Sequence, residues 1–304
     1  MHRTLTPTPP YSVMEVDPTL YDLATGSILA GRFRIVGAHR VGELATAFEV
    51  DDQAAESPSQ SRCELHVFPA GIFESEEQAL AFAASWKPWM RLNSDSVQGI
   101  REVVQVARLG YLLVSDFPQG EQLRAVLEKR ERVSVTEGLL IGQQMLEGLV
   151  ALHTHGLVHG DVKPATVYIS GEGDAMSALL VDGGVTHGLW SAKDLGEKTA
   201  LIGTPFYAPV EQFGGDAPDI QSDVYNAATV MFELLTGVLP WPGRSFLEVF
   251  QAKLDKTPPS MRERAPDVEI DPKLERVVVT GLLADKSERY PSAKEFLDEL
   301  RSCG

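Results

Sequence analysis

Segments with strand character fill the first third of this chain and helical segments fill the rest, and this order limits the fold more than any other feature. Short runs of mixed apolar and polar residues, such as RFRIV, CELHVF and YLLVSDF, are typical of strands. Between them, ESEEQALAFAASW predicts a helix with acidic residues in its first turn. Later, VTEGLLIGQQMLEGLVALHTHG has apolar residues spaced by three and four, as in an amphipathic helix. The order predicts an α+β fold with a small strand-rich lobe and a larger helical lobe.

Changes in composition give the boundaries of these parts. Residues 1–25 interleave threonine with proline, which predicts an extended or disordered tail. Residues 26–117 make up the strand-rich lobe and residues 118–304 the helical lobe. The lobes meet at PQGEQL, where proline and glycine interrupt regular structure.

The charge of the chain narrows the classes of partner. A formal net charge of -16 over 304 residues argues against nucleic acid, whose binding needs clustered lysine and arginine. It argues equally against docking on an anionic membrane surface. Such an excess of carboxylates either keeps a protein soluble through self-repulsion or forms an acidic docking face.

Cysteine usage and the N-terminal segment indicate the compartment. Cys63 and Cys303 are the two cysteines, far apart and without metal-ligand spacing, which fits a reducing environment. The first residues lack the apolar core of a signal peptide, and no stretch approaches the roughly 20 apolar residues of a membrane span. We therefore expect a cytoplasmic protein.

Five motifs in a fixed order resemble those of protein kinases, and their style is closest to bacterial serine/threonine kinases. LHTHGLVHGDVKPATVYI resembles the catalytic loop, and LLVDGGV the strand and turn that carry Asp-Phe-Gly. GTPFYAPVEQF resembles the end of the activation segment, SDVYNAATVMFELLTGVLPW the buried helix after it, and DKSERYPSAKEFLDEL the last helices. The resemblance covers about residues 31–302 and implies the two-lobed protein-kinase fold.

The resemblance also implies that three residues brace the large lobe. Asp223 should hold the backbone of the catalytic loop, and Glu211 should pair with Arg289 to support the activation segment. A buried ion pair of this kind is costly to break. Because all three residues are present, we expect the architecture of the large lobe to be intact.

On the small-lobe side, the resemblance implies an ATP site with several residues replaced. The glycine loop, which lets backbone amides approach phosphates, corresponds to residues 40–45, where only Gly42 survives and Glu43 adds a negative charge. His66 stands where the third-strand lysine is expected. Since neutral imidazole replaces a permanent ammonium poorly, His66 is interpreted as an ordinary strand residue. The helix glutamate that would hold the lysine falls near residues 84–85, Ala and Ser.

The segment that joins the lobes shows a further replacement. The resemblance places the gatekeeper at Ser115, followed by Asp116 at a position of the adenine site. Three residues after the gatekeeper, a backbone N–H is expected to donate to adenine, but Pro118 has none. The adenine contact is therefore expected to be weakened.

On the large-lobe side, part of the catalytic machinery implied by the resemblance remains. Asp161 and Lys163 keep their identities in the catalytic loop, whereas Thr166 replaces the asparagine that binds magnesium. Asp182, the second metal-binding position, is present. The phenylalanine after it is Gly183, which removes the apolar plug expected between the small-lobe helix and the catalytic loop.

These losses together predict a pseudokinase, because phosphoryl transfer depends on positioning and charge neutralisation. We expect a regulatory or scaffolding module in serine/threonine kinase signalling that binds a protein, such as an active kinase or its substrate. This reading needs no cofactor. Two alternatives stay open, both with ATP and Mg²⁺ or Mn²⁺. One is a nucleotide-binding switch that acts through Asp182, and the other is a weakly active serine/threonine kinase that uses Asp161 as its base.

Two further patterns are assigned ordinary roles. The run of His153, His155 and His159 resembles a metal motif, but the kinase register places it at a helix end and at the start of the catalytic loop. Within the activation segment, the hydroxyl-bearing residues are expected to be exposed loop residues, with phosphorylation by a partner as the alternative; these are Thr186, Ser191 and Thr199.

Overall fold

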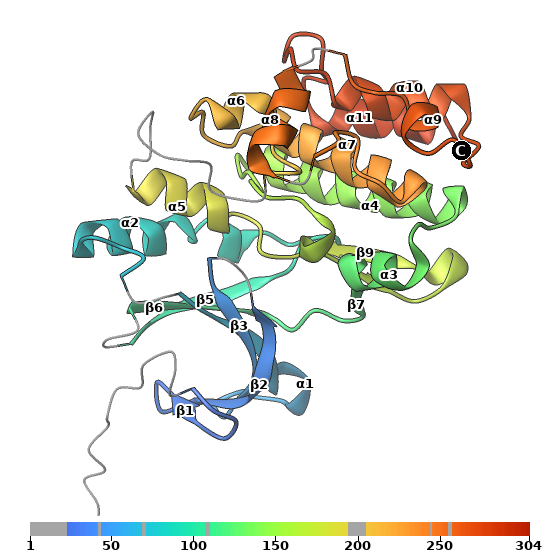
Figure 1. Ribbon diagram of the computed structural model, residues 1–304. Coiled ribbons are helices and arrows are strands. Elements are labelled where there is room, and N and C mark those ends of the chain that lie inside the picture. Colours follow the sequence, from blue (N-terminus) through green and yellow to red (C-terminus); the bar gives the residue numbers. More distant parts are fainter. Residues whose placement is uncertain are drawn as a thin grey trace, which may run out of the picture.

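The computed structural model describes residues 23–41, 44–68, 71–106, 110–193, 205–243, 245–254 and 257–304. The expected Thr/Pro tail therefore lies outside the described residues, apart from 23–25. Gly42, Glu43 and Thr199 lie outside them as well. The chain forms a small lobe built on a sheet and a larger helical lobe, stacked one on the other (Figure 1). This confirms the α+β architecture with two lobes.

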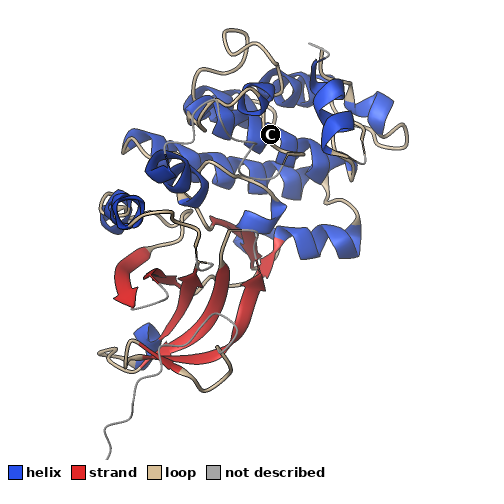
Figure 2. Cartoon of the chain, turned by 60° about the vertical axis from the view of Figure 1, so that its left-hand side comes forward, coloured by secondary structure: helices blue, strands red, loops and turns tan. Residues whose placement is uncertain are grey.

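A twisted antiparallel sheet of six strands forms the small lobe, in the order β1-β2-β3-β4-β6-β5 (Figure 2). Consecutive strands pair as hairpins, except that β4 pairs with β6, which separates β5 at the sheet edge. The last strand ends at Asp116, at the passage to the large lobe. The strands are β1 (Ile28–Leu29), β2 (Phe33–Val41), β3 (Thr46–Asp52), β4 (Arg62–Val67), β5 (Ile100–Val106) and β6 (Gly110–Asp116).

Three short helical segments complete the small lobe. The short helix α1 (Pro58–Ser61) leads into β4, and α2 (Glu76–Ser85) covers one side of the sheet. Ser75 caps α2, because its hydroxyl accepts a hydrogen bond from the backbone N–H of Gln78 at 3.2 Å. A 3₁₀ helix, η2 (Trp89–Arg91), then turns the chain toward the large lobe.

The large lobe packs around two long helices. In α4 (Val135–Thr154), a capping box joins Ser134 and Glu137 at the start of the helix. In α7 (Ile220–Thr236), nearly every residue is buried, as its sequence predicts. The remaining helices are α3 (Leu123–Arg130), α5 (Val185–Lys193), α6 (Val210–Phe213), α8 (Phe246–Leu254), α9 (Met261–Arg264), α10 (Pro272–Gly281) and α11 (Ala293–Arg301).

A second, three-stranded sheet lies in the large lobe beside the passage between the lobes. Its order is β7-β8-β9, and the strands are β7 (Glu121–Gln122), β8 (Val167–Ser170) and β9 (Ser177–Leu180). The turns that flank β8 and β9 carry the catalytic-loop residues and Asp182. These strands therefore position the residues of the large lobe that face the small lobe.

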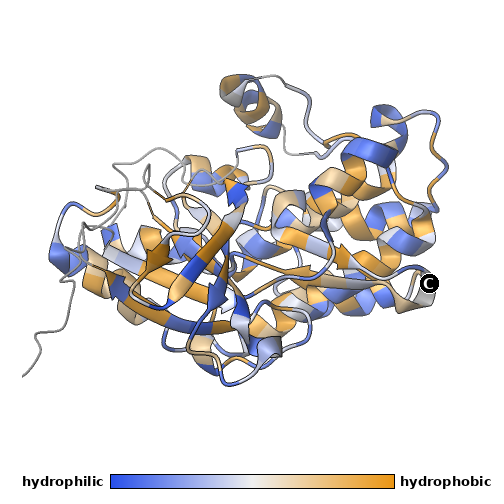
Figure 3. Cartoon of the chain, turned by 90° about the horizontal axis from the view of Figure 1, so that it is seen from below, coloured by the Kyte–Doolittle hydropathy of each residue, from blue (hydrophilic) through white to orange (hydrophobic). Residues whose placement is uncertain are grey.

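Two apolar cores support the fold. A small core lies within the strands of the small lobe, around Phe33, Phe48 and Leu65. The larger core runs through the helical lobe and continues into α2 and η2 through Phe82, Trp86 and Trp89. Apolar colouring accordingly follows parts of the strands and helices in both lobes (Figure 3). Helix α2 of the small lobe therefore packs into the same apolar core as the helices of the large lobe.

The sequence patterns missed several of the shorter helices, and α5 is the one that bears on the candidate site. The segment after Asp182 forms α5, which packs against α2 across the lobe interface. Thr186 is 1% exposed inside this helix, so the expectation of an exposed loop residue is wrong for it. Ser191 is exposed, but it lies in the helix and not in a loop. Two glycines precede α5, and glycine is typical of turns, so the local pattern did not predict a helix there.

No helix long and apolar enough to cross a membrane occurs in the part of the chain that the structure describes.

Candidate functional site

The candidate site lies between the two lobes. The small lobe contributes the ends of β2, β3 and β4, and the large lobe contributes residues 161–166 and 182–186. Among the described residues they enclose a cavity of about 110 Å³. Pockets that hold drug-sized ligands measure about 300–1,000 Å³. In this arrangement the cavity is therefore too small for a whole nucleotide.

The guanidinium group of Arg40, near the end of β2, lies between a carboxylate of the small lobe and one of the large lobe. Its Nε donates to Oε1 of Glu64 at 2.9 Å and its Nη2 to Oε2 at 2.7 Å. Nη2 also donates to Oδ1 of Asp182 at 2.8 Å, and Nη1 donates to Oδ2 of the same carboxylate. Arg40 thus makes a two-pronged contact with each of two carboxylates. Sequence reasoning placed Arg40 in the glycine loop but assigned it no role.

Glu64 is a fully buried carboxylate on β4, at 0% exposure. It points into the cleft beside His66 because residues two apart on a strand share a face. Besides Arg40, its partners are Nδ1 of His39 at 2.8 Å and Nε2 of Gln98 at 2.8 Å. Burial acts to raise the pKa of Glu64, but its histidine and arginine neighbours outweigh burial and hold that pKa well below its usual range. Glu64 is therefore a buried anion that the cleft fully satisfies.

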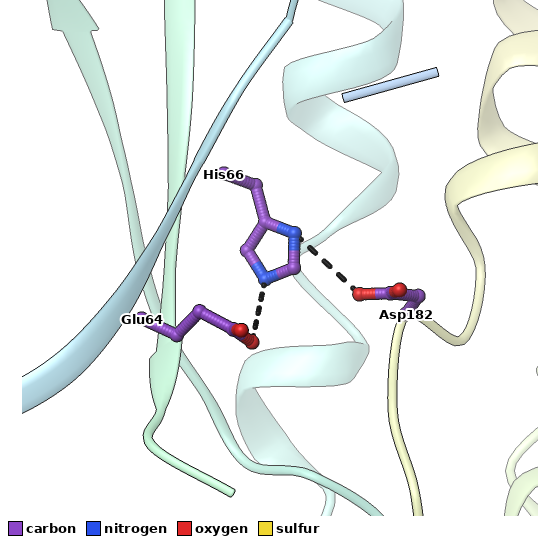
Figure 4. A group of neighbouring side chains, drawn as sticks. All are labelled: Glu64, His66 and Asp182. Atoms are coloured by element: carbon purple, nitrogen blue, oxygen red, sulfur yellow. Dashed lines mark ion pairs between the residues drawn. The ribbon is translucent and has the colours of Figure 1, made fainter. Parts of the chain in front are cut away.

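His66 lies between the two carboxylates that Arg40 binds (Figure 4). Its Nε2 is 3.1 Å from the hydroxyl of Ser115 and 3.3 Å from Oε2 of Glu64. Its Nδ1 is 3.5 Å from Oδ1 of Asp182, across the lobe boundary. His66 is thus a residue of strand β4, as expected, and its ring takes part in the cleft network. In the sequence, only the register of the CELHVF strand indicated that His66 would lie in the cleft.

Three of these side chains, Glu64, His66 and Asp182, offer ligand atoms within 4.8 Å of one another. A single metal ion binds one nitrogen of an imidazole ring, whereas here each ring nitrogen of His66 faces a different carboxylate (Figure 4). Arg40 also engages both oxygens of Asp182. The donor set in this arrangement suits a hydrogen-bonded charge network better than Mg²⁺ or Mn²⁺.

The passage between the lobes is occupied by side chains of the chain itself. The backbone carbonyl of Asp116 accepts a hydrogen bond from Nε2 of Gln98 at 2.7 Å. The carboxylate of Asp116 instead turns outward and accepts from Nε of Arg101 at 2.7 Å. Pro118 follows and offers no N–H, as the sequence predicts. Gln98 therefore satisfies the backbone carbonyl of Asp116, a residue that the motifs place at the adenine site.

Aromatic side chains of both lobes meet near Arg40. The imidazole of His39 stacks on Phe117 with ring centroids 4.6 Å apart. The hydroxyl of Tyr168, on β8, lies 3.4 Å from Nε2 of His39, and Arg40 lies over the Tyr168 ring at 5.8 Å. None of these rings stands at a position that the motifs single out, so sequence reasoning missed them.

The catalytic-loop residues hold one another. Nζ of Lys163 donates to Oδ2 of Asp161 at 2.5 Å. The hydroxyl of Thr166 accepts from the backbone N–H of Lys163 at 3.0 Å and donates to the carbonyl of Asp161 at 3.0 Å. Thr166 thus closes the loop on itself, and its hydroxyl points to the loop backbone and not to Asp182.

The bracing contacts implied for the large lobe are present. The Asp223 carboxylate accepts from the backbone N–H groups of His159 and Gly160, both at 2.8 Å, and lies 3.0 Å from Nε2 of His153. Nη1 of Arg289 donates to Oε1 of Glu211 at 2.8 Å. His153 and His159 therefore both contact Asp223, at the helix end and at the start of the catalytic loop where the register places them.

The apolar plug expected after Asp182 comes from a different residue. A Cβ atom on Gly183 would lie 2.7 Å from the ring of Trp89, and one on Gly184 would lie 2.5 Å from it. The indole of Trp89, from η2, thus occupies the space beside the turn. The expectation that Gly183 leaves this space without a plug is wrong, because a large residue from the small lobe fills it.

Comparisons with known proteins agree with this arrangement. A family model described as "Protein kinase domain" matches residues 87–300, more than half of the chain. Serine/threonine-protein kinase PkaA of Streptomyces coelicolor is 31% identical over 212 residues, 70% of this chain and 37% of that protein. Serine/threonine-protein kinase pkn3 of Myxococcus xanthus is 25% identical over 287 residues, 92% of this chain and 51% of that protein. The chain thus spans about half or less of the length of these relatives.

A solved structure shows the same fold. The kinase domain of PknI from Mycobacterium tuberculosis aligns with a TM-score of 0.68 at 20% identity, covering 93% of this chain and all of that chain, 100%. At this identity the likeness concerns the fold alone. It confirms the two-lobed protein-kinase fold expected from the motifs.

Proposed function

This chain belongs to the protein kinase domain family, and from that premise we propose that it is a pseudokinase, a regulatory or scaffolding module that binds another protein. The observation that carries the proposal is the contact of Arg40 with both Glu64 and Asp182. It places a cation and a buried anion of the chain itself where phosphates and metal would have to lie.

The charges around the cleft are arranged against ATP chemistry. Phosphoryl transfer needs metal ions on the Asp182 carboxylate and cations around the phosphates. Both oxygens of Asp182 are bound by Arg40. If Arg40 moved away to admit phosphates, the buried Glu64 would face them, and two like charges in a site of low dielectric repel strongly. Catalysis would therefore have to work against the residues that build the site.

The contacts expected for adenine are also taken. Gln98 binds the Asp116 carbonyl, and Pro118 offers no donor. A nucleobase would have to displace a buried amide that makes hydrogen bonds to both Asp116 and Glu64. Leaving those groups unpaired costs about 1–3 kcal/mol each.

Retention of the fold-bracing contacts supports a binding role. Asp223, Glu211 and Arg289 still hold the catalytic loop and the activation segment. A module that presents a protein-kinase surface needs this architecture but needs no turnover. We propose an active kinase or its substrate as the partner, in serine/threonine kinase signalling.

One observation favours a second candidate, a nucleotide-binding switch or a weakly active serine/threonine kinase. Asp161, Lys163 and Asp182 still line the cavity between the lobes. A conformation with the lobes further apart would expose all three residues to a metal–nucleotide complex.

A thermal-shift titration with ATP, with and without Mg²⁺ or Mn²⁺, separates the two candidates. A ligand at ~100 times its dissociation constant stabilises a fold by roughly 2.7 kcal/mol. We expect no shift at millimolar ATP and no transfer of labelled phosphate to a general protein substrate. A metal-dependent shift that disappears in Asp182→Asn, but persists in the exposed control Asp216→Asn, would contradict the proposal and support the switch.

A further inference from the structure

We propose that the cleft between the lobes is a guanidinium-binding site whose resident ligand is Arg40 of this same chain. The inference rests on the proposed function, because it explains what holds the cleft in place of a nucleotide. The chemical class of ligand is a planar cation that donates hydrogen bonds on two edges.

The geometry of the two carboxylates matches a guanidinium group. Nε and Nη2 of Arg40 face the two oxygens of Glu64 at 2.9 and 2.7 Å, and Nη2 and Nη1 face those of Asp182. A guanidinium offers five N–H donors in a fixed fork, and this fork suits a carboxylate on either edge. An ammonium group is a point charge and would not satisfy both carboxylates in this way.

The charge balance of the cleft requires a cation at this place. Glu64 and Asp182 bring two negative charges close together, and each is held by Arg40. The other permanent cation that lines the cavity, Lys163, pairs with Asp161. Other titratable neighbours are His39 and His66, which contact Glu64 through one ring nitrogen each, and Tyr168, whose ring lies under Arg40. Without Arg40, Glu64 would keep the imidazoles of His39 and His66 and the amide of Gln98, which are all uncharged when the imidazoles are neutral.

The Arg40 contact also joins the lobes. Arg40 and Glu64 belong to the sheet of the small lobe, whereas Asp182 follows β9 in the large lobe. Arg40 is only 9% exposed, so the contact is shielded from water. Other clefts of this family receive an anionic ligand, whereas this cleft presents two carboxylates and binds a cation. The Arg40 side chain neutralises both carboxylates and, by joining them, closes the cleft.

Chemical rescue tests the proposal on the full chain. Arg40→Ala removes the atoms that ethylguanidinium contains, so added ethylguanidinium can occupy the vacated space. We expect Arg40→Ala to lower the thermal midpoint by roughly 6–20 °C and millimolar ethylguanidinium to restore much of that loss. Equal concentrations of sodium chloride and ethylammonium should restore much less, since neither offers a planar fork.

Arg34→Ala is the matched control. Arg34 lies on the same strand, is 53% exposed, and pairs with Asp51 on the sheet surface. We expect a small loss and no rescue there. If Arg40→Ala does not fold unaided, refolding yield from urea is measured with and without ethylguanidinium, and recovery only in its presence supports the site.

Three outcomes would overturn the inference. One is an unchanged midpoint in Arg40→Ala, and another is an equal response of both variants to ethylguanidinium. The third is restoration of Arg40→Ala by Mn²⁺ or Zn²⁺ but not by ethylguanidinium, which would make the cleft a metal site. The rescue experiment contains no nucleotide, so a failed rescue would not contradict the proposal that the protein does not turn over ATP. Conversely, a thermal shift of the wild type with ATP would not change the result of the rescue experiment.

Discussion

At the scale of single residues, the protein buries charges only where other groups satisfy them. Glu64 lies in the cleft with four partners, and the side chain of Arg289 is fully buried against Glu211. Lys253, on α8, is 1% exposed, and its Nζ donates to the carbonyls of Pro205, Phe206 and Ala208. These contacts show why each charge is tolerated, since an unpaired buried charge is costly.

Lys253 makes the stability of the protein depend on pH. Burial lowers the pKa of its ammonium group to about 7, although the charge of Glu211 acts to raise it. In the unfolded chain a lysine pKa lies near 10.4, so between about pH 7 and pH 10 the unfolded state binds more protons. The free energy of unfolding should therefore rise with pH in this window, by up to about 1.4 kcal/mol per pH unit from this group.

Urea unfolding of the wild type and of Lys253→Met at several pH values measures this contribution. The difference in slope between them isolates Lys253, because both chains share every other titrating group. Parallel curves from pH 7 to pH 10 would show that Lys253 keeps an ordinary pKa in the folded state.

At the scale of elements, the contact of α2 and η2 with α5 decides how the lobes meet. Trp89 reaches from η2 to the two glycines that precede α5, and Gly188 of α5 approaches Ser85 and Phe82 of α2. Gly184 has φ +80°, a conformation that favours glycine. The segment after Asp182 can therefore turn sharply beneath Trp89 and start a helix.

Restoring the family's phenylalanine should harm the protein, because Trp89 already fills its place. Gly183→Phe is expected to cost about 1–3 kcal/mol through overpacking, and Trp89→Ala about 3–5 kcal/mol through loss of a buried ring. In the double variant the phenylalanine can enter the space that Trp89 leaves. We therefore expect its loss of stability to be smaller than the sum of the single losses.

Thermal unfolding of the four proteins in this cycle measures the coupling. Met90→Ala, next to Trp89 but more exposed at 38%, is the control and should not compensate for Gly183→Phe. Additive losses in the Gly183→Phe, Trp89→Ala pair would mean that the ring and the turn do not compete for the same space.

At the scale of the whole molecule, the lobes are joined at several separate places. Arg40 binds Asp182 across the cleft, Trp89 plugs the turn, and Leu180 of β9 exchanges backbone hydrogen bonds with Ser96 and Gln98. Each of these contacts joins a residue of the small lobe to a residue of the large lobe. Arg40 thus closes the cleft at Asp182, and the other contacts hold the two lobes together away from it.

Restoring the lysine alone should therefore not restore activity. In His66→Lys the new ammonium would meet Glu64 and Asp182 while Arg40 still binds both carboxylates. We expect no transfer of labelled phosphate from ATP to a general protein substrate above that of Asp161→Asn, which lacks the expected base. ATP-dependent phosphorylation by His66→Lys that Asp161→Asn abolishes would show that the cleft is one substitution from activity.

Much of this arrangement follows from the order of residues along the chain. Apolar patterning located strands of the small lobe and the long helices, because apolar periodicity is a local property. The motifs placed Asp223, Glu211 and Arg289 in their bracing roles and brought His66, Asp161 and Asp182 to the cleft. The missing N–H of Pro118 is a matter of covalent chemistry and needs no structure.

Only the tertiary structure decided what occupies the cleft. Arg40, Glu64 and Asp182 are far apart in sequence, and their contact depends on strand pairing and on the approach of the lobes. Trp89 and Gln98 were likewise assigned no role, because their neighbours come from other segments. Local sequence patterns predict on which face of a strand or helix a residue lies. Which residue it contacts across the cleft depends on how the whole chain packs.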